Sequence, residues 1–227
     1  MESIFSNKTF HAVIFFILTA LFIVFVFFPS LKKINTDFPN YYVSSNMFLD
    51  GKDLKTGYDN VEFNKQVLYY GIEDQFVSFV PYPPVNALLM LPLARLEPLT
   101  AKLFWNIFNI IFFLLSIFFI SKISGLNFFP AGILFFASGY AFVNNFFFGQ
   151  AYLLVLMLFT ASVYFLYKGK DIPAALLFSL SVLLKFYTVF FLLLFLCRKK
   201  FKFTVASIIF IILLNLLVFT VTGWDLN

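Results

Sequence analysis

Long, uninterrupted runs of apolar residues constrain this chain more than any other feature. Residues 10–28 contain no Asp, Glu, Lys or Arg, and further apolar runs cover 103–120, 126–143, 151–167 and 203–221. A helix of about 20 such residues crosses the ~30 Å hydrocarbon core of a bilayer. The chain is 62% hydrophobic and 12% charged, whereas soluble domains carry about 25% charged residues. This excludes a water-soluble fold and predicts an all-α, polytopic transmembrane helical bundle.

The first apolar run leads into a polar segment, residues 29–81, which we predict to be an outer loop. No small-residue cleavage site follows the run, so we interpret residues 10–28 as an uncleaved first transmembrane helix. Two stretches of the loop place apolar residues at helical spacing: Tyr41, Phe48 and Leu49 in the first, and Phe63, Val67 and Tyr70 in the second. Such amphipathic helices lie flat at a membrane surface. We expect two short interfacial helices, ended by Gly51 and Gly57.

The remainder, residues 82–221, supplies the further transmembrane helices of what we expect to be a single membrane domain over 1–227. The run 85–96 is short and contains Pro92, so we expect it not to cross or to merge with its neighbour. The run 172–197 is apolar except for Lys185 near its middle. A bare charge at the bilayer centre costs about 2.5–3.5 kcal/mol on insertion scales, so we predict two short helices that turn at Lys185.

Basic residues predict the orientation. Cytoplasmic loops of membrane proteins are enriched in Lys and Arg, and the strongest basic loops here are Arg198, Lys199, Lys200 and Lys202, followed by Lys168 and Lys170. This places Asp37, the turn 144–150 and Lys185 together on the outer face, most simply of a plasma (inner) membrane. The net charge of +5 then reports cytoplasmic anchoring, and no basic patch with interleaved aromatics indicates a nucleic-acid partner.

The chain offers little for metal or redox chemistry. Cys197 is the only cysteine and His11 the only histidine, which excludes an internal disulfide and leaves no recognisable ligand set. We expect neither a metal nor another cofactor.

Asp37 is the leading candidate for chemistry, because an acid within a few residues of a membrane boundary is a poor choice for packing. It can act as a general base towards a hydroxyl group. It can also cap a helix that begins at Phe38, with Pro39 in the first turn. Lys185 and Gln150, the other polar residues on the outer face, can likewise have purely structural roles. Lys185 can extend its ammonium to the membrane interface, and Gln150 can form hydrogen bonds with backbone groups at its turn.

The order of these features resembles the polytopic GT-C-type glycosyltransferases, and in detail glycosyltransferase family 87, from about Asp37 to Lys202. Three blocks carry the resemblance: first Asp37, Tyr41-Tyr42, Gly51-Lys52-Asp53-Leu54 and Tyr58; then Tyr82-Pro83-Pro84, Pro92 and Trp105; then Gly149-Gln150, Leu153-Leu154, Lys185 and Arg198-Lys199-Lys200. Tyr152 stands where the family usually has Asn, and Phe186-Tyr187-Thr188 follow Lys185 where it usually has Pro. Family members are commonly longer, so the chain is expected to be incomplete at its C-terminus.

The resemblance implies transfer of a hexose, often mannose, from a polyprenyl-phosphate sugar to a hydroxyl of a glycan or glycolipid acceptor, with inversion. Asp37 would be the catalytic base. Lys185 and Gln150 would bind the leaving phosphate, and Tyr41, Tyr42 or Tyr82 would stack on the sugar. The three tyrosines are also compatible with an ordinary interfacial aromatic belt.

Two other interpretations compete with the enzyme. A transporter of a lipid-linked precursor would have ionisable residues in several spans or two similar broken halves, whereas the sequence shows one central Lys and no internal repeat. A non-catalytic or truncated scaffold of the same fold is the second alternative.

Overall fold

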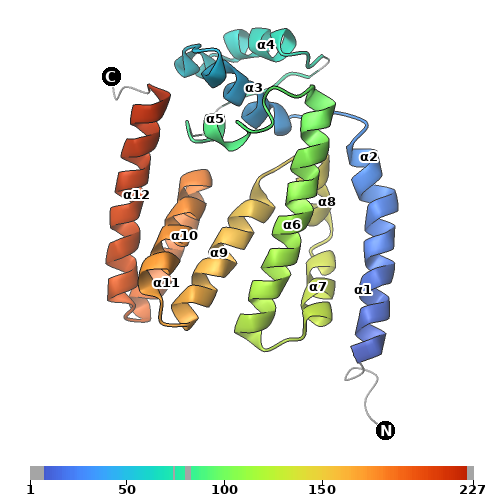
Figure 1. Cartoon of the computed structure of the whole chain (residues 1–227), viewed down its shortest axis with the longest axis vertical. Coiled ribbons are helices and arrows are strands. Elements are labelled where there is room, and N and C mark those ends of the chain that lie inside the picture. Colours follow the sequence, from blue (N-terminus) through green and yellow to red (C-terminus); the bar gives the residue numbers. More distant parts are fainter. Residues whose placement is uncertain (1–7, 74, 80–82, 224–227) are drawn as a thin grey trace.

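The computed structural model describes residues 8–73, 75–79 and 83–223, and within these ranges the chain is helical with no strand (Figure 1). The predicted all-α class is confirmed. Helix α1 (Lys8–Phe22) continues through a π-helical turn (Ile23–Phe27) into α2 (Phe28–Ser30). With α6 (Pro98–Ser124) and α12 (Phe201–Thr222), it makes three described helices long and apolar enough to cross a membrane.

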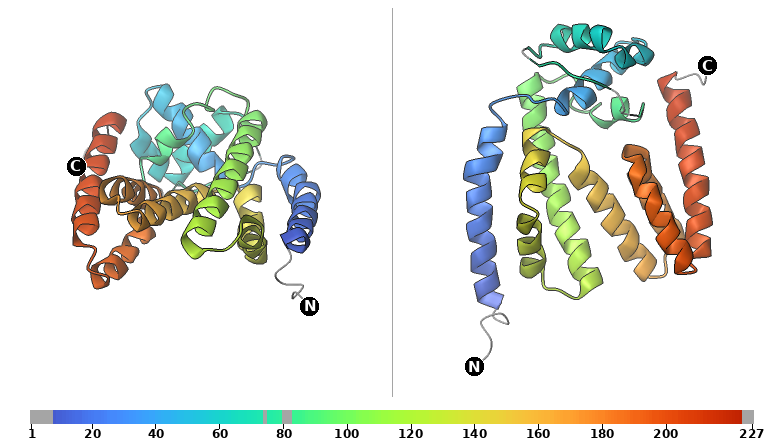
Figure 2. Two further views of the ribbon diagram at one scale, coloured as in Figure 1. Left: turned by 60° about the horizontal axis from the view of Figure 1, so that its bottom comes forward. Right: turned by 180° about the vertical axis from the view of Figure 1, so that it is seen from behind.

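Three short helices lie across one end of these long helices and form what we call the roof (Figures 1 and 2). They are α3 (Phe38–Leu49), α4 (Asn60–Tyr69) and α5 (Asn86–Leu89), with a 3-10 turn (Leu54–Tyr58) between the first two. The two predicted loop helices are therefore confirmed. The run 85–96 forms only the single turn of α5 and then non-helical chain, so it does not cross, as expected from its length.

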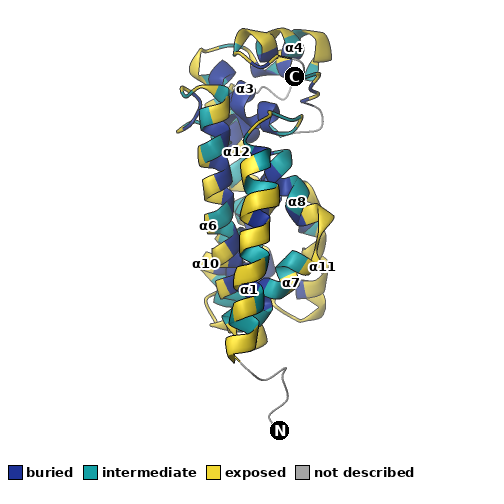
Figure 3. Ribbon diagram, turned by 90° about the vertical axis from the view of Figure 1, so that its right-hand side faces the viewer, coloured by how far each residue is buried: buried dark blue, intermediate teal, exposed yellow. Residues whose placement is uncertain are grey.

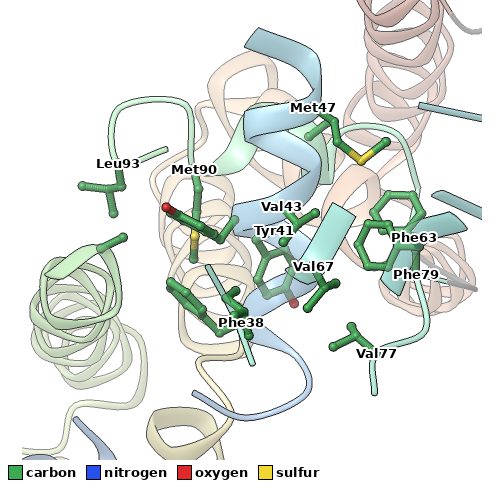
Figure 4. Close-up of a cluster of buried hydrophobic side chains, with 14 of the residues drawn as sticks. Phe38, Tyr41, Val43, Met47, Phe63, Val67, Val77, Phe79, Met90 and Leu93 are labelled. Atoms are coloured by element: carbon green, nitrogen blue, oxygen red, sulfur yellow. The ribbon is translucent and has the colours of Figure 1, made fainter. Parts of the chain in front are cut away.

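The roof has its own apolar core. Phe38, Tyr41, Val43 and Met47 of α3 pack against Phe63 and Val67 of α4, Val77 and Phe79 of the following segment, and Met90 (Figure 4). Trp105 of α6 belongs to the same cluster. Because apolar burial is the main stabilising term in folding, this shared core fixes the roof on the end of the bundle.

Short helices complete the bundle. The chain passes from α6 through α7 (Phe128–Ala137) and α8 (Tyr140–Phe147) back to the roof, and α9 (Tyr152–Tyr167) leads away from it again (Figure 1). The span predicted over 126–143 is not one continuous helix, because Gly139, at φ +57°, divides the run into α7 and α8. Helices α8 and α9 meet at a bend of 119°. If this pair counts as one broken span, the described chain has up to four spans.

The last part of the chain confirms the predicted turn at Lys185. Helix α10 (Asp171–Leu184) ends there, and a 3-10 turn (Phe186–Phe190) and α11 (Phe191–Cys197) carry the chain back. The ammonium of Lys202 lies 3.9 Å from a carboxylate oxygen of Asp171, so both ends of this hairpin are at the same end of the bundle. Lys185 is thereby directed to the roof end.

The outward faces of the long helices are apolar and exposed (Figure 3). On α1 and its continuation, Phe16, Val24 and Phe25 are each more than half exposed. Exposed apolar surface of this extent is typical of helices that face lipid. Together with the three long apolar helices, it identifies a membrane protein.

Candidate active site

Asp37 and Gln150 are joined side chain to side chain. The amide nitrogen Nε2 of Gln150 donates a hydrogen bond of 2.7 Å to the carboxylate oxygen Oδ2 of Asp37, and both residues are half-buried. Asp37 stands at the N-cap position of α3 and Pro39 in its first turn, but the carboxylate makes no capping bond to the helix. The capping role considered for Asp37 is therefore absent, and its carboxylate is turned to the α8–α9 bend.

The bend brings Gln150 to Asp37 by backbone contacts. The amide of Phe38 donates to the carbonyl of Phe148 at 2.8 Å, and the amide of Gln150 donates to the carbonyl of Asn145 at 2.8 Å. Between them, Gly149 has φ +66°, and a Cβ built on it would lie 2.9 Å from Cβ of Phe38. The close approach of the two segments thus requires glycine at this position.

Helix α6 supports the bend from the other side. The indole nitrogen of Trp105 donates to the carbonyl of Gly149 at 2.8 Å, and Nδ2 of Asn145 donates to Oδ1 of Asn109 at 3.0 Å. Non-helical backbone at membrane depth is tolerated where protein groups satisfy it. Here Trp105 donates to the carbonyl of Gly149, and Oδ1 of Asn145 accepts from the backbone amide of Leu153 at 3.3 Å. Side chains of α6 therefore stabilise the bend between α8 and α9 through these hydrogen bonds.

The side chains of Lys185, at the end of α10, and Tyr152, at the start of α9, lie near the Asp37 carboxylate. The Lys185 ammonium lies 5.0 Å from the ring centroid of Tyr152, within the range of a cation–π contact. The carboxylate of Asp37 lies close enough to both side chains to interact with them electrostatically, and Tyr187 lies near Tyr152. Tyr152 and Tyr187 are 41% and 43% exposed, so their rings are accessible to a ligand.

The predicted sugar-stacking residues are placed differently. Tyr41 is 0% and Tyr42 4% exposed. The ring of Tyr42 stacks on Phe38 with 5.5 Å between centroids, and its hydroxyl donates to the carbonyl of Leu96 at 2.7 Å. We therefore correct the assignment of these two rings from sugar platforms to core residues. Tyr82 lies outside the described residues.

Sequence reasoning missed the binding potential of Tyr152 and the buried polar face of α6. Lys102, Asn106 and Asn109 are all 0% exposed, and their spacing of four and three residues places them on one helix face. Polar residues on one face of a predicted span were the available signal. Within the described parts of the chain, no three His, Cys, Asp or Glu side chains are grouped as metal ligands.

The sequence model of glycosyltransferase family 87 matches residues 79–226, about two thirds of the chain. The chain belongs to glycosyltransferase family 87. The match contains Trp105, Gln150, Tyr152 and Lys185 but begins beyond Asp37, whose place in the site rests on the geometry above. No curated protein and no solved structure matches this family 87 chain. With its apolar spans, the chain is a membrane glycosyltransferase.

Proposed function

We propose that the chain transfers a hexose, such as mannose, from a polyprenyl-phosphate sugar to a hydroxyl of a glycan or glycolipid acceptor, with inversion at C1. The observation that carries the proposal is the contact of Gln150 with Asp37 beside Lys185. It places a fixed carboxylate, a cation and two accessible aromatic rings at the roof end of the membrane helices. In this proposal the roof and the helices of 82–221 form one membrane domain.

Asp37 acts as the general base. A sugar hydroxyl is a weak nucleophile at neutral pH and gains reactivity when a positioned carboxylate accepts its proton. In one displacement, the acceptor oxygen bonds to C1, its proton passes to Asp37, and the bond from C1 to the phosphate oxygen breaks. Attack from the face opposite the leaving group inverts C1. The amide of Gln150 holds the carboxylate in place, so we assign it a positioning role in place of phosphate binding.

Lys185 binds the leaving group. The polyprenyl phosphate departs as an anion and is stabilised by a nearby cation. Lys185 is suited to this role because the turn between α10 and the following 3-10 helix presents its side chain at the roof end. The ring of Tyr152 lies 5.0 Å from the Lys185 ammonium, and the exposed rings of Tyr152 and Tyr187 each offer a flat apolar face to a sugar. In this scheme the displacement proceeds without a bound metal ion.

The distribution of charge supports a site on the outer side of a plasma (inner) membrane. At the end of the bundle opposite the roof lie Lys122, Lys168 and Lys170, and the basic segment 198–202. Of the described acids, only Asp171 lies at that end. Because Lys and Arg are retained on the cytoplasmic side, the roof and Asp37 face outward, where a lipid-linked donor and a glycan acceptor can meet.

The test is transfer of radiolabelled mannose from polyprenyl-phosphate mannose in membranes that contain wild type or Asp37→Asn at matched levels. An Asn side chain can still accept the Gln150 hydrogen bond through its carbonyl oxygen, so the variant removes the base and retains the contact. We expect transfer by wild type and none by Asp37→Asn. Asp171→Asn, which neutralises an acid at the opposite end, is the matched control and should transfer like wild type.

Equal transfer by wild type and Asp37→Asn would refute the role of Asp37. Absence of transfer by wild type, with this donor and with glucose and galactose donors of the same lipid, would refute the proposed donor class.

A further inference from the structure

Lys102 is a lysine with no solvent exposure. It lies in the first turns of α6 and is 0% exposed, among the largest fully buried side chains in the described chain. Its ammonium donates to two backbone carbonyls, those of Lys33 and Phe147, the latter at 2.9 Å. Burial of an ammonium group costs free energy that an apolar side chain would avoid. The position of Lys102 therefore calls for an explanation beyond packing.

The two carbonyls belong to the two segments that carry the candidate base and its partner. Lys33 lies in the connection between α2 and α3, four residues before Asp37, and Phe147 ends α8 three residues before Gln150. Lys102 thus joins both segments to the long, straight helix α6. One side chain therefore bridges two chain segments that lie far apart in the sequence.

Neighbouring contacts also hold these two segments. The amide of Asn35 donates to the carbonyl of Phe147 at 2.9 Å, and the backbone amide of Phe38 donates to Phe148. Trp105 binds the bend alone, through Gly149. Asn106, one turn further along α6, also reaches both segments, because it donates to Oγ of Ser30 at 2.9 Å and to the carbonyl of Phe146 at 3.3 Å. Lys102 holds the residues that stand nearer in sequence to Asp37 and Gln150, so its loss would loosen both segments where they carry that pair.

We propose that Lys102 is a positioning residue: by holding the carbonyls of Lys33 and Phe147, it fixes the carboxylate of Asp37 against the amide of Gln150. Its contribution to transfer rests on the proposed function, whereas its effect on the geometry does not. Lys102 does not touch the reacting atoms and acts through Gln150.

The first experiment measures kinetics. Lys102→Met keeps a long unbranched side chain and removes the ammonium donor. Because Lys102 acts through Gln150, and loss of the Gln150 amide should itself lower kcat roughly tenfold, we expect kcat to fall by up to roughly tenfold with the KM for the donor within about twofold. In a Gln150→Leu background, the same substitution should lower kcat no further. Ser162→Ala, which removes a buried bond between α9 and the carbonyl of Ala174, is the control and should reduce kcat equally in both backgrounds.

The second experiment reads the geometry without activity. Asp37→Cys and Gln150→Cys are combined with Cys197→Ser, which removes the only native thiol, and a short bismaleimide is used to join the two cysteines. We expect rapid cross-linking when Lys102 is present, at least about fivefold slower cross-linking with Lys102→Met, and no change with Ser162→Ala.

The two experiments separate the inference from the proposed function. Unchanged cross-linking in Lys102→Met overturns the positioning role, whether or not the wild type transfers sugar. Slower cross-linking in a protein without transfer supports the positioning role and counts against the proposed function alone. Additive losses in the kinetic cycle would show that Lys102 acts on transfer other than through Gln150, which also overturns the inference.

Discussion

The amide of Gln150 donates a 2.7 Å hydrogen bond to the carboxylate of Asp37 across 113 residues of sequence. This contact joins the polar loop after the first membrane helix to a bend between two later ones. The contact gives the Asp37 carboxylate a fixed orientation. A hydrogen bond from an amide to an ionised carboxylate is stronger than a hydrogen bond between two neutral groups.

Loss of the amide should impair the chemical step. Gln150→Leu removes the donor to Asp37, and we expect kcat for sugar transfer to fall roughly tenfold, as for one hydrogen bond to a charged group. Gln150→Glu should be worse, because it places a like charge beside the base. Steady-state transfer assays on both variants check this. Gln66→Leu, which removes an amide from the roof surface, is the control. Wild-type kcat in Gln150→Leu would contradict the prediction.

Removal of the cation should weaken use of the donor. Lys185→Met leaves no ammonium for the phosphate, and a hydrogen bond to a charged group contributes about 1.5–3 kcal/mol. We expect the KM for the polyprenyl-phosphate sugar to rise roughly 10- to 100-fold, with partial recovery in Lys185→Arg. Donor titrations give the values. Lys170→Met neutralises a lysine at the opposite end and should leave the KM unchanged; an equal effect from both variants would count against a local role.

The aromatic ring of Tyr152, and not its hydroxyl group, should contribute to binding of the sugar donor. Tyr152→Ala removes the surface on which a sugar would stack, so we expect weaker donor binding, whereas Tyr152→Phe should resemble wild type. Tyr167→Ala, at the far end of the same helix and 69% exposed, controls for loss of an exposed ring. Competition assays with the free sugar phosphate measure the difference. The idea fails if Tyr152→Phe loses as much binding as Tyr152→Ala.

The glycine before Gln150 should be intolerant of a side chain. Gly149→Ala costs about 1–2 kcal/mol for a left-handed backbone and also brings a Cβ to 2.9 Å from Phe38. Gly169→Ala is a matched control, because Gly169 has φ +72° and a Cβ added there would meet nothing within 4 Å. Thermal unfolding in detergent should show a larger loss for Gly149→Ala, and only that variant should lose transfer activity. Equal losses would contradict the close approach.

Acid should weaken the attachment of α3 to α4. Asp50 accepts hydrogen bonds from Tyr70 and Arg95, at 2.7 and 2.8 Å, and these bonds, Tyr70 first, lower the pKa of Asp50 below its usual value. A carboxyl group with a lowered pKa in the folded state stabilises that state above its unfolded pKa, about 4. The contribution is lost as the pH falls through the folded pKa.

Wild type should therefore unfold at a higher temperature than Asp50→Asn at about pH 6, and the difference should shrink as the pH falls through the lowered pKa of Asp50. The difference should be small, because the ion pair with Arg95 is exposed and screened by solvent and salt. Thermal unfolding across this pH range tests it. A difference that does not change with pH would show that Asp50 acts through packing and not through its charge.

The sequence by itself determined the class of the fold and the main breaks in it. Apolar runs in 10–28, 103–120 and 203–221 became long helices, because no other structure satisfies backbone groups in lipid. The charge of Lys185 predicted the turn between α10 and α11, since a bare ammonium at that depth is costly. Asp37 was selected as the candidate base from its position at a membrane boundary, and the family was recognised from the order of short motifs.

Only the tertiary structure decided which side chains share the site. The periodicity that placed Tyr41 and Tyr42 on a helix did not say which face of α3 would be covered, and the roof core buried both. The capping potential of Asp37 was local, but Gln150 offered its carboxylate a partner from 113 residues away. Lys102 was one lysine among 16 basic residues until α6 packed beside the α8–α9 bend. Local spacing determines helices, whereas contacts between distant segments depend on how those helices pack.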